Sequence, residues 1–214
     1  MQVKSMHFKA TSSAKLNDAV LQTALKRAKG KFVDGRAAAV AEIDTWQDIR
    51  THAAALRDRV IANLDAYLIE FEQNAMARGA VVHWAETAGE ANAIIVKIAQ
   101  DNAVKIATKS KSMVSEEIAL NDALEAVGVE VVETDLGEYI LQLAKEPPSH
   151  IVAPALHKSK EQVADLFMAA HQKPRLTDIP ALALEAREVL RAKFLGADMG
   201  ISGANFVKIG RAHV

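Results

Sequence analysis

One polar segment of the sequence carries the side chains best suited to an anionic ligand. It reads TKSKSMVSEE over residues 108–117, and its candidate ligand-binding residues are Lys109, Ser110, Lys111, Ser112 and Glu116. Lysine ammonium groups, together with the free amides at a helix start, can hold a carboxylate or a phosphate. The alternative is a capped helix with solvated lysines. The segment lacks the glycines of a nucleotide-binding loop, so we expect no tightly held nucleotide.

A second group of candidates begins in the stretch TDLGEYILQLAKEPPSH, residues 134–150. Asp135 and Glu138 are three residues apart and share one face if the segment is helical. Either carboxylate could then accept a proton from a substrate hydroxyl, and each is also a candidate ligand-binding residue. The alternative is that they cap the turn or pair with a lysine. His150 is a further catalytic candidate and His157 a further ligand-binding one, but both equally suit structural hydrogen bonding.

Composition excludes several kinds of function. The 214-residue chain has no cysteine, so it can form no disulfide, thiolate nucleophile or cysteine-ligated iron–sulfur cluster, and no histidine or carboxylate spacing predicts a metal site. Its 26 basic and 27 acidic residues give a net charge of −1, which argues against nucleic-acid binding. No signal peptide or apolar membrane span is visible, and we expect a cytosolic protein.

The first third of the chain has the apolar spacing of long helices. Apolar residues recur every three or four positions over residues 16–28 and again over 46–71, which predicts two helices. The simplest interpretation is a helical hairpin that packs on a neighbouring domain.

From Gly79 onward the pattern changes to alternating strands and helices. Strands are predicted at 80–85, 103–108, 129–134 and 150–155. Helices are predicted at 87–100, 112–128, 160–171 and 181–194, with a short helical turn at 136–144 and a short apolar segment at 199–206. This alternation is typical of βαβ units, so the predicted fold class is α/β, a mostly parallel sheet with flanking helices, preceded by long N-terminal helices.

Ligands of parallel sheets bind beyond the carboxyl ends of the strands. The residues after the second, third and fourth predicted strands are therefore expected to form one anion-binding cleft, in which residues 109–112 face Asp135, Glu138 and His157. The same reasoning makes Lys109 an accessible cleft residue, whose replacement by alanine weakens anion binding and leaves the fold largely intact.

Four stretches together resemble the lactate utilization protein B family. They are KSKSMVSEEI (109–118), ETDLGEYILQL (133–143), PPSHIVAPALHKSKEQV (147–163) and GISGANF (200–206). The helical lead-in and the first predicted strand, residues 46–91, extend the resemblance, which covers nearly all of residues 10–206.

The resemblance implies a cytosolic iron–sulfur protein that acts with two partner subunits in oxidising L-lactate to pyruvate. It also implies an α/β domain similar in fold to the isomerase and CoA-transferase group, followed by a segment that holds two 4Fe-4S clusters through cysteines. Because this chain has no cysteine, we expect no cofactor in it and expect the electron-transfer half to be missing. The domain would then bind a ligand or partner, act as an isomerase- or transferase-type catalyst, or serve as a scaffold for other subunits.

The end of the sequence departs from the family pattern. Residues 209–214 read IGRAHV, which resembles the translation of a common sequencing adapter. We therefore expect a C-terminally truncated protein with three parts: a helical lead-in over 1–78, an incomplete α/β domain over 79–207, and a non-native read-through tail over 208–214.

Overall fold

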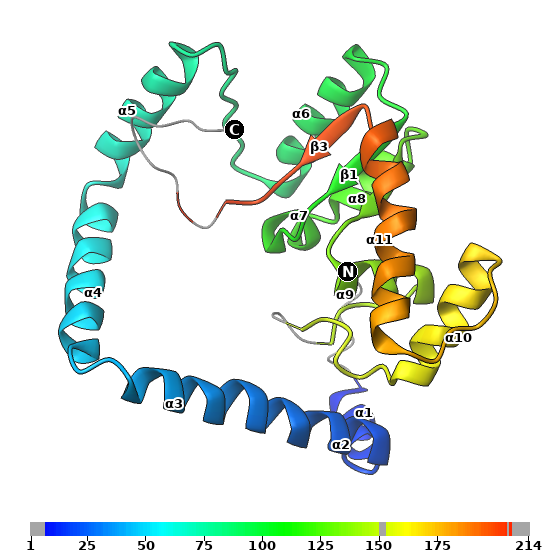
Figure 1. The fold of residues 1–214 in the computed structure, drawn as a ribbon. Coiled ribbons are helices and arrows are strands. Elements are labelled where there is room, and N and C mark those ends of the chain that lie inside the picture. The colour runs from blue at the N-terminus through cyan, green and yellow to red at the C-terminus, as the bar shows by residue number, and fades with distance from the viewer. Residues whose placement is uncertain (1–6, 150–152, 205, 207–214) are drawn as a thin grey trace. The chain divides into compact units, whose positions relative to one another are not determined.

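The computed structural model describes residues 7–149, 153–204 and 206. The chain divides into two compact units, one formed by residues 1–28 and 86–203 and the other by residues 29–85 and 204–214. The first unit contains the sheet (Figure 1), and the described elements of the second are helices. The predicted division into a lead-in, an α/β domain and a tail stays a prediction.

The sheet-containing unit has three strands in the order β2-β1-β3, and both neighbouring pairs are parallel. The predicted α/β class with flanking helices is thus confirmed. The elements of this unit are α1 (Phe8–Leu16), α2 (Ala19–Ala28), α6 (Ala88–Asp101), β1 (Ile106–Lys109), α7 (Met113–Glu117), α8 (Leu120–Glu125), β2 (Glu130–Glu133), α9 (Leu136–Ala144), α10 (Lys160–His171), α11 (Ile179–Gly196) and β3 (Met199–Ile201).

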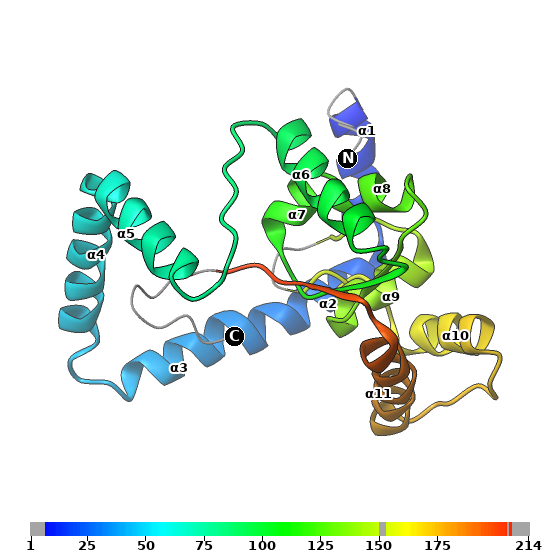
Figure 2. The same ribbon diagram turned by 90° about the horizontal axis from the view of Figure 1, so that it is seen from above.

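Each face of the sheet has its own hydrophobic core. Successive residues of a strand point to opposite faces, and neighbouring residues of β2 accordingly join different cores. Val132 packs with buried residues of α9, α10 and α11. Val131 packs with Ala107 of β1 and with buried residues of α6 and α8. Figure 2 shows α6 and α11 on opposite sides of the sheet, so the unit is a three-layer α/β arrangement.

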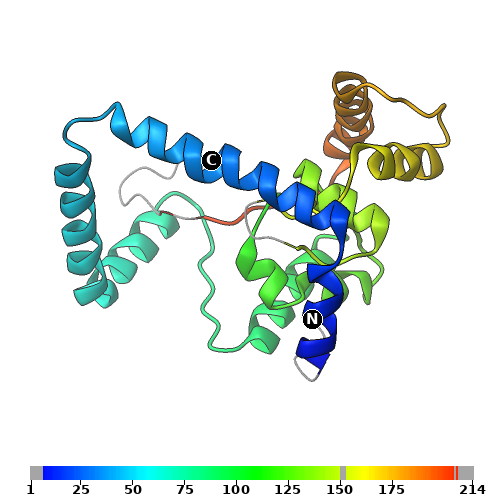
Figure 3. The ribbon, with the colours of Figure 1, turned by 90° about the horizontal axis from the view of Figure 1, so that it is seen from below.

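Capping residues explain where the helices around the sheet begin. The Thr87 side chain accepts a hydrogen bond from a first-turn amide of α6, and Asp178 does the same for α11. Ser159 and Gln162 form a reciprocal capping box at the start of α10. Figure 3 shows α10 beside α11. The caps of α10 and α11 therefore fix the start of each helix in the pair that covers one core.

Two predicted helices are interrupted, and a third begins later. The helix expected over 112–128 breaks at Ala119, whose φ of 54° places it in the left-handed region. The helix expected over 46–71 breaks at Asn63, whose side-chain amide donates to the Arg59 carbonyl oxygen at 2.8 Å. Asparagine side chains compete with the backbone in this way. The helix expected from residue 16 begins at Ala19.

Two predicted strands are not observed as expected. Residues 80–85 lie outside the sheet. The Trp84 indole donates to Glu72 of helix α5 (Leu64–Met76) at 2.7 Å, so this apolar segment associates with a helix. Of the strand expected at 150–155, residues 150–152 lie outside the described residues. Residues 153–155 begin a turn, which is closed by a bond from the Leu156 amide to the Ala153 carbonyl oxygen at 3.0 Å.

The second unit exposes an apolar groove. Its elements are the π-helical segment η2 (Lys29–Asp34), α3 (Gly35–Ala41), α4 (Trp46–Ala62) and α5 (Leu64–Met76). The groove has a volume of about 790 Å³, and its walls include Leu56, Tyr67 and Trp84. No helix in the part of the chain that the structure describes has the length and apolarity needed to cross a membrane.

Candidate functional site

The carboxyl ends of the three strands meet at one edge of the sheet because all three strands run in the same direction. The backbone ladder continues to this edge. The Ser110 amide donates to the Ile201 carbonyl oxygen at 2.9 Å, and the Thr134 amide donates to the Lys109 carbonyl oxygen at 2.9 Å. We call this region the strand-end site. It comprises residues 109–112, 133–138 and 201–203, with Ser115 and Glu116 of α7.

Lys109 is the buried lysine of the strand-end site. Its side chain is fully buried, and its Nζ lies 2.8 Å from Glu133 Oε1 and donates to Ser115 Oγ at 3.1 Å. Lys109 shares a face of β1 with Ala107, which packs in the core covered by α6 and α8. The expectation of an accessible cleft lysine is therefore wrong at this position, because the register places its ammonium group against a carboxylate of the neighbouring strand.

Residues of α7 and α8 surround this buried ion pair, in which Glu133 Oε2 has no hydrogen-bond partner among the described residues. The Asn121 side-chain amide donates to Glu133 Oε1 at 2.8 Å. Ser115 Oγ, which accepts from Lys109, donates in turn to the Ser112 carbonyl oxygen at 2.9 Å. Charge-assisted bonds of this kind are strong in a low-dielectric interior. The network therefore ties the start of α7 and one turn of α8 to the strand ends.

Lys111 is the lysine that the strand-end site exposes. Its side chain is 30% exposed, and its Nζ lies 3.2 Å from Oε1 of Glu138, whose own side chain is only 5% exposed. Glu116 of α7 is the second carboxyl that acts on Glu138. Burial and then this second carboxyl raise the pKa of Glu138 to about 7, against the opposing effect of Lys111. The site thus combines an accessible cation with an acid that can exchange a proton at neutral pH.

The helix starts at this edge do not offer free amides to a ligand. Ser112 Oγ accepts the Ser115 amide at 3.3 Å, so the cap of α7 is internal. Asp135 Oδ1 accepts the amides of Gly137 and Glu138 at 3.0 and 3.4 Å and thereby caps α9. For Ser112 and Asp135 the geometry matches the structural alternative, and ligand binding by either residue stays a prediction.

Two close backbone approaches position the site. A Cβ atom at Gly137 would meet Cγ of Pro154 at 2.8 Å, and a Cβ atom at Gly203 would meet the Ser112 side chain at 2.9 Å. Real Cβ atoms do not come this close to other heavy atoms, so glycine is needed at both positions. The loop after β3 thus lies directly against the segment after β1.

His157 belongs to a different cluster. Its Nδ1 lies 2.8 Å from Ser149 Oγ, and its Nε2 lies 2.8 Å from Oε2 of Glu146, which also pairs with Lys158. Glu146 lies just beyond the end of α9, whereas Glu138 lies in the first turn of that helix. The structure does not bring His157 to Lys111 and Glu138 as expected. His150 lies outside the described residues.

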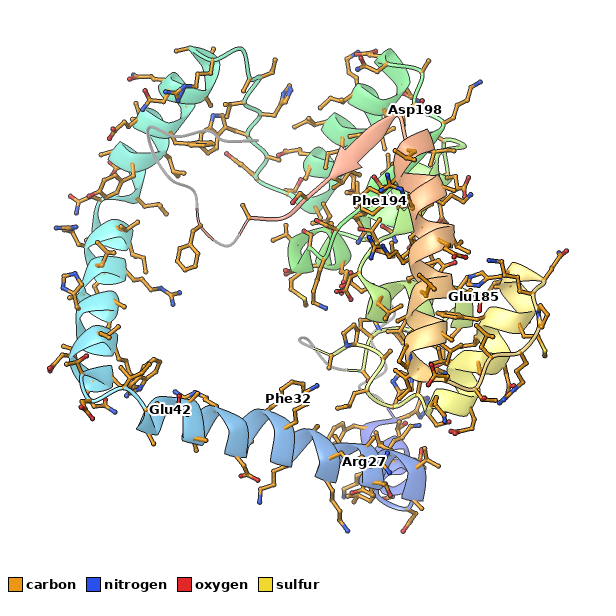
Figure 4. The ribbon with its side chains drawn as sticks, in the orientation of Figure 1. Arg27, Phe32, Glu42, Glu185, Phe194 and Asp198 are labelled. Atoms are coloured by element: carbon orange, nitrogen blue, oxygen red, sulfur yellow. The ribbon has the colours of Figure 1, made fainter. Side chains whose placement is uncertain are left out.

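One buried polar chain gave no signal in the sequence. The Tyr139 hydroxyl lies 2.8 Å from His171 Nε2, and His171 Nδ1 lies 2.8 Å from Glu185 Oε1. All three side chains are buried. Figure 4 shows Glu185 on the side of α11 that faces α10. The residues come from three helices, so only the packing of α9, α10 and α11 could bring them together.

The carboxylates and the histidine of the strand-end site and of this polar chain are not arranged to hold a metal ion. Among the described residues, no group of three or more His, Asp or Glu side chains is placed to hold a metal ion. The accessible ammonium group of the strand-end site is that of Lys111, which could pair with a small anion in place of Glu138.

Comparison with known proteins places the chain in a family. The LUD domain family matches residues 68–207. Lactate utilization protein B of Lysinibacillus sphaericus (strain C3-41) is 47% identical over 208 residues, which cover 96% of this chain and 44% of the relative. The protein of the same name from Macrococcus caseolyticus (strain JCSC5402) is 42% identical over 207 residues, which cover 96% of this chain and 43% of the relative.

A third relative carries the same name. Lactate utilization protein B of Geobacillus kaustophilus (strain HTA426) is 48% identical over 172 residues, covering 80% of this chain and 36% of the relative. The chain therefore spans less than half the length of these curated relatives. No solved structure matches it. The predicted resemblance to lactate utilization protein B is confirmed, and the chain belongs to the LUD domain family.

Proposed function

We propose that this chain serves in lactate utilization and that its strand-end site binds a small carboxylate such as L-lactate or pyruvate. The names of the similar proteins support the process. The observation that carries the binding site is Lys111, a partly exposed cation at the carboxyl edge of a parallel sheet beside the buried Glu138 carboxyl. A bound carboxylate would take over part of the charge pairing that Glu138 provides in the free protein.

We also propose a cofactor and partner subunits for the longer relatives' counterpart of this chain. Following the resemblance, the full-length protein is a cytosolic iron–sulfur subunit of an L-lactate-oxidising complex with two partner subunits. Iron–sulfur clusters are held mainly by cysteine thiolates. This chain contains no cysteine and therefore does not fit such a cluster. Electron transfer is accordingly assigned to a part of the relatives that this chain does not match.

Calorimetric titration of the purified chain with L-lactate and pyruvate tests the binding site, with sodium chloride as an ionic control. A charge-assisted hydrogen bond contributes about 1.5–3 kcal/mol. Lys111→Gln should therefore weaken carboxylate binding by roughly tenfold to a hundredfold. Lys105→Gln is the matched control, because this exposed lysine directly precedes β1 at the opposite edge of the sheet.

Carboxylate binding that is unchanged in Lys111→Gln, or absent from the wild-type chain, would contradict the proposed site. Deletion of the gene in the source organism tests the process separately. Growth on L-lactate as the sole carbon source should be lost and growth on glucose retained.

A further inference from the structure

The Glu138 carboxyl has one hydrogen-bonded oxygen and one that lacks a partner. Its Oε1 accepts from Lys111 at 3.2 Å. Its Oε2 is buried and has no hydrogen-bond partner among the residues that the structure describes. A buried carboxylate oxygen without a donor is unfavourable. Protonation of Glu138 removes this buried charge, and the Glu116 carboxyl favours that protonation because it would repel a charged Glu138.

The other titratable groups around Glu138 are already occupied elsewhere. On its own helix, Asp135 accepts backbone amides. On β2, Glu133 pairs with Lys109, and on α10, His171 lies between Tyr139 and Glu185. The charged groups that act on the Glu138 carboxyl are therefore Lys111 from the loop after β1 and Glu116 from α7.

Charge balance at this cluster changes when an anion binds. In the free protein, one ammonium group faces two carboxyls, and the cluster is neutral only while Glu138 holds a proton, which it loses as the pH rises through its pKa of about 7. A carboxylate that pairs with Lys111 adds a negative charge beside Glu138, which raises the proton affinity of Glu138. Conversely, a deprotonated Glu138 competes with the ligand for Lys111. Ligand binding and proton binding must then favour each other, because thermodynamic coupling is reciprocal.

We propose that a monocarboxylate binds at Lys111 together with uptake of one proton by the buried Glu138 carboxyl beside it. This inference rests on the proposed carboxylate site and specifies its ligand and its regulation. The only bond formed is the O–H bond of the protonated carboxyl, and the proton comes from solvent. Because the site offers one accessible ammonium group beside two carboxyls, a dicarboxylate or phosphate would bring an unbalanced second charge and should bind at least tenfold more weakly.

Titration calorimetry of the whole chain with L-lactate measures the coupling directly. At pH 7.5, titrations in HEPES, imidazole and Tris buffers, which differ in ionisation enthalpy, should report uptake of between half a proton and one proton per lactate. The dissociation constant should rise from pH 6 to pH 8, approaching tenfold per pH unit at the upper end, because one proton is linked to binding. Succinate and inorganic phosphate serve as the dianionic probes.

Variants of the two carboxyls separate the coupling from binding itself. Glu138→Gln should bind lactate with no proton uptake and with a dissociation constant independent of pH. Glu116→Gln removes the like charge and should move the pH dependence to lower pH. Glu117→Gln is the matched control, since Glu117 is an exposed residue of the same helix, and should behave as the wild type.

Different results would contradict the proton coupling and the carboxylate site. Lactate binding that depends on Lys111 but takes up no proton between pH 6 and pH 8 would overturn the coupling and leave the binding site intact. Proton uptake that persists in Glu138→Gln would also overturn it. Absence of lactate binding across this pH range would overturn both the binding site and the coupling.

Discussion

Lys109 and Glu133 are register partners at the ends of β1 and β2, and Lys109 Nζ lies 2.8 Å from Glu133 Oε1 with both side chains buried. The pair belongs to the strand-end site, in which Lys111 is the partly exposed lysine. Burying two charges is unfavourable, and their mutual attraction offsets this only while both are present. The protein should therefore tolerate both charges or neither, but not one alone.

Replacement of Lys109 alone should destabilise the fold strongly. Lys109→Ala leaves Glu133 as an uncompensated buried carboxylate, so we expect the free energy of unfolding to fall by about 3–5 kcal/mol. Urea unfolding at pH 7 measures this. Lys97→Ala, which removes an exposed ion pair with Asp101, should cost less than about 1 kcal/mol. A Lys109→Ala protein as stable as Lys97→Ala would contradict the buried pair.

Replacement of both partners should be milder than replacement of one. The double variant Lys109→Met, Glu133→Leu puts apolar side chains of similar volume in place of the two charges, and such exchanges are often neutral or stabilising. We expect it to be more stable than either single variant by at least about 2 kcal/mol. Urea midpoints of the four proteins form a double-mutant cycle, and additive effects would show that the two residues are not coupled.

The buried chain from Tyr139 through His171 to Glu185 should stabilise the packing of three helices. Tyr139→Phe keeps the ring, which packs against Phe167 at a centroid distance of 6.1 Å, but removes the hydroxyl partner of His171. We expect a loss of about 1–3 kcal/mol in unfolding free energy. Tyr67→Phe in the second unit is the control. Equal stabilities of these two variants would argue that the hydroxyl bond contributes nothing.

The contact between Gly203 and Ser112 should not tolerate a methyl group. Gly203→Ala places a Cβ atom 2.9 Å from the Ser112 side chain, and overpacking of this kind costs about 1–3 kcal/mol. Gly200 lies nearby in β3, and a Cβ atom there would meet nothing within 4 Å, so Gly200→Ala is the control. Thermal unfolding should show a lowered midpoint for Gly203→Ala and a nearly unchanged one for Gly200→Ala; the reverse order would refute the contact.

Glu138 should make stability depend on pH even without a ligand. Burial and Glu116 raise its pKa from 4.5 to about 7 in the folded protein, so the folded state holds a proton that the unfolded chain releases above pH 4.5. The stability it contributes is complete below about pH 4.5 and is lost as the pH rises through about 7. The difference in unfolding free energy between wild type and Glu138→Gln should change by about 3 kcal/mol between pH 4.5 and pH 8.

Urea unfolding at intervals across that range measures the difference. Contributions of groups unaffected by the substitution cancel, and Glu117→Gln should show no comparable change. A difference that stays constant with pH would mean that Glu138 titrates with an ordinary pKa.

Local patterns in the sequence determined most of the elements around the site. The segment 160–171 follows a capping serine, Ser159, has a glutamine three residues after that serine and carries an apolar stripe, and α10 has those bounds. The expected helical turn at 136–144 is α9 for the same reason, because Asp135 caps it. Alternation of strands and helices likewise indicated a parallel sheet, and with it the edge at which β1 and β2 place their polar residues.

Only the tertiary structure decided which of the two lysines faces solvent. Lys109 and Lys111 are two residues apart and chemically identical, but Lys109 ends a strand whose register sets it against Glu133, whereas Lys111 lies beyond the ladder. The same holds for His157, which the turn after α9 directs to Glu146, and for the chain from Tyr139 to Glu185. Such contacts depend on strand register and on helix packing between residues far apart in the sequence. Local residue spacing predicts neither of these.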